Sequence, residues 1–115
     1  MGDHRKLEIY KLACELSDCV DELLPHLPSR VRSRLGDQLV RAAESIHLNI
    51  AEGCGFNSDA LLKKHIKYSI ASANEVEDAI ATLSRRRLLP LQDHDLPEKS
   101  TVLRKKIGAF LRRLK

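Results

Sequence analysis

The feature that most constrains the fold is an apolar repeat that runs without interruption from residue 59 to residue 87. Its members alternate at spacings of four and three residues, the pattern of a helix with one face packed on neighbouring helices. They are Leu62, Ile66, Ser69, Ala73, Val76, Ile80 and Leu83. At about 1.5 Å per residue, such a helix spans roughly 45 Å, longer than an ordinary globular helix. The rest of the chain is therefore expected to align along this axis.

Three further segments carry helical periodicity, at about residues 5–24, 30–52 and 98–113. The connections between them are short, and short connections make neighbouring helices antiparallel. No segment shows the alternating pattern of a strand. The sequence predicts an all-α fold, an antiparallel up-down-up-down four-helix bundle, in a single domain over residues 1–115.

Local signals place the helix ends. Ser29 is a possible N-cap of the second helix, and Asn57 or Ser58 can cap the third. Gly53 is the residue type that most easily ends a helix, so residues 53–57 are expected to form the turn between the second and third helices.

Composition supports a helical core and narrows the class of protein. Aromatic residues make up 3% of the chain and Trp is absent, so the core must consist of Leu, Ile, Val and Ala. No apolar run is long enough to cross a bilayer, and the N-terminal segment is amphipathic, so we expect a cytoplasmic protein with no membrane contact. Cys14, Cys19 and Cys54 lack metal-ligand spacing and are expected to be reduced thiols, with Cys14 in the core.

No motif for catalysis or cofactor binding is visible. Glu44 and His47 have the i, i+3 spacing used by di-iron bundles, but that chemistry needs a second such pair, which this sequence lacks. The sequence therefore predicts neither a metal site nor a cofactor, and a protein that is not an enzyme.

A polar row interrupts the apolar face of the second helix. Ser45, Asn49 and Glu52 stand at i, i+4 and i+7 and share one side. Counting outward from the expected turn places Asn49 beside about residue 61 and Arg41 near residue 69, so an ion pair between Arg41 and Glu75 is possible. Either these residues form a hydrogen-bond network that fixes helix register or a subunit contact, or they form a ligand site; we favour the network.

The charge pattern gives the clearest functional indication. The formal net charge is +4, and the basic excess lies toward the C-terminus. Antiparallel geometry brings two groups of arginines to one end of the bundle: Arg30, Arg32 and Arg34 with Arg85, Arg86 and Arg87. Guanidinium groups bind phosphate oxygens bidentately, so this cluster suits an RNA or DNA backbone. The alternative is a solvated helix end, partly neutralised by Asp18, Asp21 and Glu22.

Residues 45–53 resemble the signature of a bacterial family of four-helix bundle proteins. This family includes proteins encoded in intervening sequences of large-subunit ribosomal RNA genes and accessory proteins of diversity-generating retroelements. Residues 7–13 resemble the opening segment of the family, with Tyr10 where Trp is common. Residues 38–43 lead into the signature, and Ser58 and residues 72–77 follow it in order. The sequence departs from the family pattern at His47, Phe56 and Ala71, where Pro, a basic residue and Gly are common.

The resemblance implies a homopentamer with a basic surface, in some members associated with a reverse transcriptase and its RNA. We therefore expect a non-enzymatic, homo-oligomeric scaffold that binds nucleic acid through basic helix ends. A protein-only interaction module is the alternative. The sequence leaves open the ribosomal or retroelement context and the choice between RNA and DNA.

Overall fold

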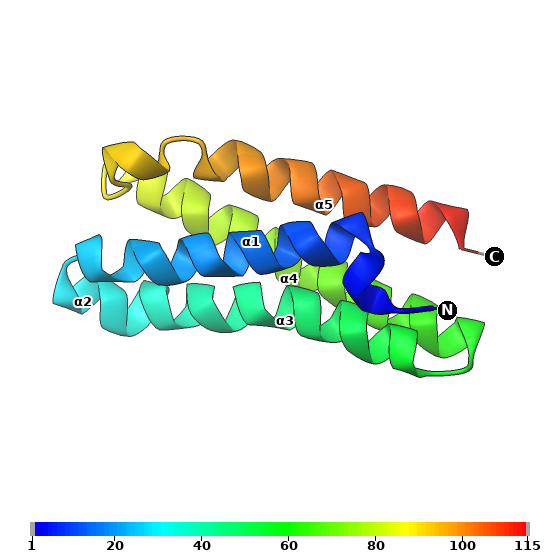
Figure 1. Ribbon diagram of the computed structural model, residues 1–115. Helices are drawn as coiled ribbons and strands as arrows, with labels where there is room; N and C mark the ends of the chain where they lie inside the picture. The colour runs from blue at the N-terminus through cyan, green and yellow to red at the C-terminus, as the bar shows by residue number, and fades with distance from the viewer. Residues whose placement is uncertain (1, 115) are drawn as a thin grey trace.

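Four long helical segments run along one axis in the computed structural model, which describes residues 2–114 (Figure 1). In chain order the elements are η1 His4–Lys6, α1 Glu8–Leu23, η2 Leu24–His26, α2 Ser29–Val31, η3 Arg32–Gly36, α3 Asp37–Gly55, α4 Asp59–Arg85, η4 Leu91–Asp93 and α5 Leu96–Arg113. Helix α1 packs against α3 and α5, and α4 packs against the same two helices. The predicted antiparallel four-helix bundle is confirmed, with extents of 44 × 22 × 20 Å.

The second long segment is built from α2, η3 and α3, which follow one another without a break. Segment η3 is a π-helical turn, in which the backbone N–H of Asp37 donates to the carbonyl of Arg32. The prediction that Ser29 is the N-cap was wrong, because Pro28 holds that position and Ser29 is the first helical residue. Proline at the cap fixes the extended conformation from which the helix begins.

The turn between α3 and α4 lies later in the chain than predicted. Gly53 does not end α3, because the helix continues to Gly55 and Phe56 is its C-cap. A Cβ atom on Gly53 would lie 2.9 Å from the Cβ of His65 on α4, so glycine permits the close approach of the two helices. Ser58 caps α4, as predicted, by accepting a hydrogen bond from the N–H of Leu61 at 3.3 Å.

The ends of α4 and α5 also differ slightly from the prediction. Helix α4 ends at Arg85 rather than at residue 87, because Arg87 adopts a left-handed conformation with φ of 59°. The N–H of Leu88 then donates to the carbonyl of Leu83, which closes the helix end. Helix α5 begins at Leu96, two residues before the predicted start.

The core is aliphatic, as the composition requires. Its largest fully buried side chains are Leu23, Leu39, Ile46, Ile50, Ile66, Ile80, Leu83, Leu96, Leu103, Ile107, Val20 and Val76. Cys54 is buried in this core, whereas Cys14 is only half-buried, so the core thiol was assigned to the wrong cysteine. Among the described helices, none combines the length and the apolar character needed to cross a bilayer.

Candidate nucleic-acid interface

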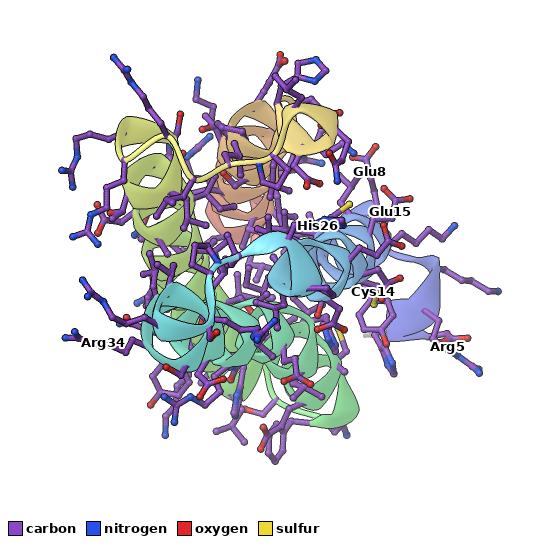
Figure 2. The ribbon with its side chains drawn as sticks, turned by 90° about the vertical axis from the view of Figure 1, so that its left-hand side faces the viewer. Arg5, Glu8, Cys14, Glu15, His26 and Arg34 are labelled. Atoms are coloured by element: carbon purple, nitrogen blue, oxygen red, sulfur yellow. The ribbon has the colours of Figure 1, made fainter. Side chains whose placement is uncertain are left out.

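The six arginines singled out in the sequence lie at one end of the bundle, and all are exposed. Arg30 belongs to α2, and Arg32 and Arg34 belong to η3. The chain direction of α4 brings its last residues to the same end, where Arg85 to Arg87 follow one another. Figure 2 views this end and shows Arg34 on one side of the bundle, with Glu8 and Glu15 on the opposite side.

Half of these arginines line one cavity. It has a volume of about 390 Å³ and lies between the α2–η3 segment and the end of α4. Its lining consists of Arg30, Val31, Arg34, Leu35, Gln38, Thr82 and Arg86. None of these is acidic, so the described part of the chain presents three guanidinium groups around a partly apolar hollow. Arg32, Arg85 and Arg87 are exposed beside it and do not line it.

The arginines at this end carry no direct counter-charge. Within residues 2–114, none of the six forms an ion pair, and neither do the acids expected to neutralise them: Asp18, Asp21 and Glu22. Some basic side chains elsewhere are neutralised, since Arg104 pairs with Glu77 and Lys106 pairs with Glu8, each at 2.9 Å. The positive charge of the arginine end is therefore available to a ligand.

The predicted polar row forms a hydrogen-bond network between α3 and α4. The amide nitrogen of Asn49 donates to the carbonyl of Ser45 at 2.9 Å and to its hydroxyl at 3.0 Å. The hydroxyl of Ser72 also donates to that of Ser45, at 2.8 Å. The amide oxygen of Asn49 must then act as an acceptor, so Nδ1 of His65, 3.1 Å away, carries the hydrogen.

Aromatic rings enclose the far end of this network. His65 stacks on Phe56, with ring centroids 5.4 Å apart, and meets the edge of Tyr68 at 5.6 Å. A carboxylate oxygen of Glu52 lies 3.9 Å from Nδ1 of the same imidazole. The position of the polar row was readable from the sequence, but its partners His65 and Ser72 were not identified.

The remaining two members of the predicted network are not paired with each other. Glu75 accepts a hydrogen bond of 3.4 Å from the side chain of Gln38. Arg41 is exposed and forms no ion pair among the described residues, so the possible Arg41–Glu75 ion pair is not formed. Both side chains instead line a second cavity.

The missed partners follow from the misplaced turn. Asn49 reaches residue 65 rather than the expected residue 61, a difference of about one helical turn. Because α3 extends two residues past Gly53, every contact between α3 and α4 moves toward the C-terminus of α4. Ser69 is buried in the same interface between α3 and α4, and its hydroxyl donates to the carbonyl of Ile46 at 2.8 Å.

The second cavity extends the first along the α3–α4 pair. It has a volume of about 400 Å³ and is lined by Arg34, Gln38, Arg41, Ala42, Ser45, Ser72 and Glu75. Arg34 and Gln38 line both cavities, so together the two form one surface, which we call the α3–α4 groove. This groove connects the arginine end to the polar network. From the sequence, the arginine end and the polar network were predicted as separate features, because no local signal links residues so far apart in the chain.

Two cysteine thiols lie in surroundings that keep them protonated. Burial raises the pKa of the Cys19 and Cys54 thiols, which disfavours the reactive thiolate. No cluster of His, Cys, Asp and Glu side chains within residues 2–114 has the arrangement needed to hold a metal ion.

Comparison with known proteins supports a single family assignment. A search of curated proteins found no match. A family model described as 23S rRNA-intervening sequence protein matches residues 5–109. This match covers all four long helices except the last residues of α5, and it includes both the polar network and the six arginines. The chain therefore belongs to the 23S rRNA-intervening sequence protein family.

Proposed function

We propose that the protein is a non-enzymatic, homo-oligomeric scaffold that binds the phosphate backbone of nucleic acid through its arginine end. The observation that carries this proposal is the cavity lined by Arg30, Arg34 and Arg86, which has no acidic lining residue and whose guanidinium groups have no ion-pair partner among the described residues. Guanidinium groups offer forked hydrogen bonds that match phosphate oxygens. A polyanion supplies the negative charge that the lining of this cavity lacks.

The mode of recognition follows from what surrounds the arginines. The aromatic rings of Phe56 and Tyr68 lie near His65, at the opposite end of the α3–α4 pair. No aromatic side chain lines the arginine cavity among the described residues. Base stacking on aromatic rings is the usual basis of single-strand binding, so this site reads charge and shape instead.

Two triple variants with the same change of charge test the proposal. Arg30→Gln, Arg34→Gln and Arg86→Gln together remove the cavity-lining cations, whereas Arg32→Gln, Arg85→Gln and Arg87→Gln remove the neighbouring ones. Gel-shift titrations over a salt series from about 50 mM should show a slope shallower by about 0.7 to 0.9 for each phosphate that the variant no longer neutralises. We expect the first variant to lose more affinity and more slope than the second.

Two results would contradict this assignment. If the wild-type protein binds neither RNA nor duplex DNA at low salt, the protein has no nucleic-acid function at this surface. If the two variants weaken binding equally, the cavity geometry is irrelevant and only the total charge matters. Circular dichroism controls for folding, and exposed helix-end substitutions typically change stability by less than about 0.5 kcal/mol.

The alternative function is a protein-only interaction module, and one observation favours it. A cavity of about 280 Å³ between α1 and α5 is lined by the apolar side chains of Leu12, Leu16 and Val102 together with three acids and one lysine: Glu15, Asp95, Glu98 and Lys99. Such a surface suits a protein partner and repels a polyanion. Absence of nucleic-acid binding together with oligomer formation would favour this alternative.

The resemblance noted above offers two contexts for the nucleic-acid function, ribosomal RNA and a reverse transcriptase with its RNA. In either context a homopentamer would repeat the arginine end around a ring. A reverse transcriptase gene beside a variable repeat in the genomic neighbourhood would support the retroelement context. Its absence, together with a gene inside a 23S ribosomal RNA insertion, would support the ribosomal one.

A further inference from the structure

Glu75 is a carboxylate in the middle of a cationic groove. It lines the second cavity together with Arg34 and Arg41, and it is exposed. A site that binds only phosphate gains nothing from a carboxylate, because two like charges about 4 Å apart repel by about 1 kcal/mol even in water. A ligand that carries a hydrogen-bond donor next to its phosphates would therefore suit this carboxylate better than phosphate alone.

The hydrogen bonds of Glu75 leave room for such a donor. Its Oε2 atom accepts one long bond, 3.4 Å from Nε2 of Gln38. No donor within residues 2–114 bonds to its Oε1 atom, and neither Arg34 nor Arg41 forms an ion pair with it. An ionised carboxylate accepts up to about four hydrogen bonds, so most of its capacity is unused.

The ribose 2′-hydroxyl is a hydrogen-bond donor that lies next to the phosphates in the nucleic-acid backbone. The guanidinium groups of Arg34 and Arg41 line the cavity and offer hydrogen-bond donors to phosphates, and the sugar is the chemical neighbour of the phosphate in the chain. In A-form RNA the 2′-hydroxyls are displayed on the wide, shallow minor groove, where a protein can reach them. The backbone of DNA carries no such donor.

We propose that the α3–α4 groove selects RNA over DNA because Glu75 accepts a hydrogen bond from a ribose 2′-hydroxyl while Arg34 and Arg41 bind the adjacent phosphates. This inference rests on the proposed function and deepens it, since it names the class of nucleic acid. A hydrogen bond to a charged acceptor corresponds to about tenfold in affinity. DNA meets the same repulsion between the carboxylate and its phosphates but lacks the hydrogen bond that offsets it.

The test compares two duplexes of the same sequence, one of RNA and one of 2′-fluoro RNA. Both adopt the A form, but the fluorinated duplex has no 2′-hydroxyl donor, so shape is held constant. The wild-type protein is expected to bind the RNA duplex about tenfold more tightly. In Glu75→Ala the two affinities should become equal. Glu75→Gln keeps a carbonyl acceptor and should retain part of the preference.

Asp78→Ala is the matched control, because Asp78 is an exposed acid on α4 that does not line the groove. It removes the same charge as Glu75→Ala and should strengthen binding to both duplexes equally, leaving the preference intact. Equal wild-type affinity for the two duplexes, or a full preference in Glu75→Ala, would overturn the inference while the proposed function stands. Failure of the wild-type protein to bind either duplex would also overturn the inference, and failure to bind duplex DNA as well would overturn the proposed function.

Discussion

At the residue scale, two glycines near the end of α3 meet opposite surroundings. A Cβ on Gly53 would lie 2.9 Å from the Cβ of His65, whereas a Cβ on Gly55 would meet no atom within 4 Å. Alanine favours a helix over glycine by about 1 kcal/mol, so helix propensity alone predicts that both substitutions stabilise the protein. The contact with α4 reverses this sign at Gly53.

We expect Gly53→Ala to lower the free energy of unfolding by about 1 to 3 kcal/mol, the usual range for overpacking. Gly55→Ala should raise it, by about 1 kcal/mol or less. Urea denaturation followed by circular dichroism measures both on the same scale. A stabilised Gly53→Ala variant would show that α4 can move away from α3 without cost.

A second substitution tests the polar network. Asn49→Ala removes the side chain that links Ser45 to His65, and it leaves the half-buried imidazole N–H without its acceptor. The expected loss of stability is about 1 to 3 kcal/mol. Asn74→Ala on the exposed face of α4 is the control and should cost less than about 0.5 kcal/mol. Similar values for the two variants would mean that the network adds no stability.

At the element scale, the sequence determined the helices well and their register poorly. The repeat from Leu62 to Leu83 requires a long helix packed along one stripe, and no competing structure buries those residues. Gly53 lies inside α3 where α4 approaches closely, so this glycine marks a tertiary contact and not the end of the helix. Helix propensity is a local quantity and cannot report that contact.

In the candidate site, too, some features were predictable from the sequence and others were not. The arginines at the two helix ends could be brought together from topology alone. The α3–α4 groove could not be predicted, because it depends on which side chains of α3 and α4 face each other, and a shift of one turn changes every pair. The π-helical turn at η3 also changes the helical register between Arg30 on α2 and the side chains of α3, which no sequence pattern indicated.

Glu77 links α4 to α5 and gives this pair a predicted pH dependence. The hydrogen bond donated by Thr101 and the ion pair with Arg104 lower the pKa of Glu77 below its usual value of 4.5. A carboxyl whose pKa is lower in the folded state stabilises the protein above the unfolded pKa, and this contribution is lost as the pH falls through the folded pKa.

We therefore expect Glu77→Gln to be less stable than the wild type at neutral pH, with a difference that shrinks in acid. Urea denaturation at pH 7 and at about pH 3 measures this change. Asp78→Asn, at the adjacent exposed position of α4, is the control and should show no comparable pH-dependent difference. A difference for Glu77→Gln that is constant with pH would indicate a packing effect instead of the charge.

At the scale of the whole molecule, six exposed arginines gather at one end of the bundle. Figure 2 views this end and shows Arg34 on the side away from Arg5, Glu8 and Glu15. A polyanion approaching in solution is therefore oriented by the field before any contact forms, and its association rate should fall steeply with salt. A ring of subunits would repeat the arginine end around its axis.

The last prediction concerns that oligomer and the surface that forms it. Leu48 and Tyr68 are large apolar side chains that remain 57% and 47% exposed. Leu48 precedes Asn49 in the network, and the ring of Tyr68 contacts His65, so both flank the same part of the α3–α4 pair. Covering them on a neighbouring subunit would remove apolar surface from water without blocking the arginine end.

Light scattering at micromolar concentration should give the wild-type protein a mass several times the 13.0 kDa of one chain. Leu48→Lys with Tyr68→Lys should reduce this mass to that of a monomer, whereas Val102→Lys on α5, at a residue that is 40% exposed, should not. Loss of the oligomer should also weaken nucleic-acid binding, because contacts that follow the first form at high effective concentration. A wild-type monomer would remove the multivalent part of the proposal, and a double variant that stays oligomeric would place the interface on another face.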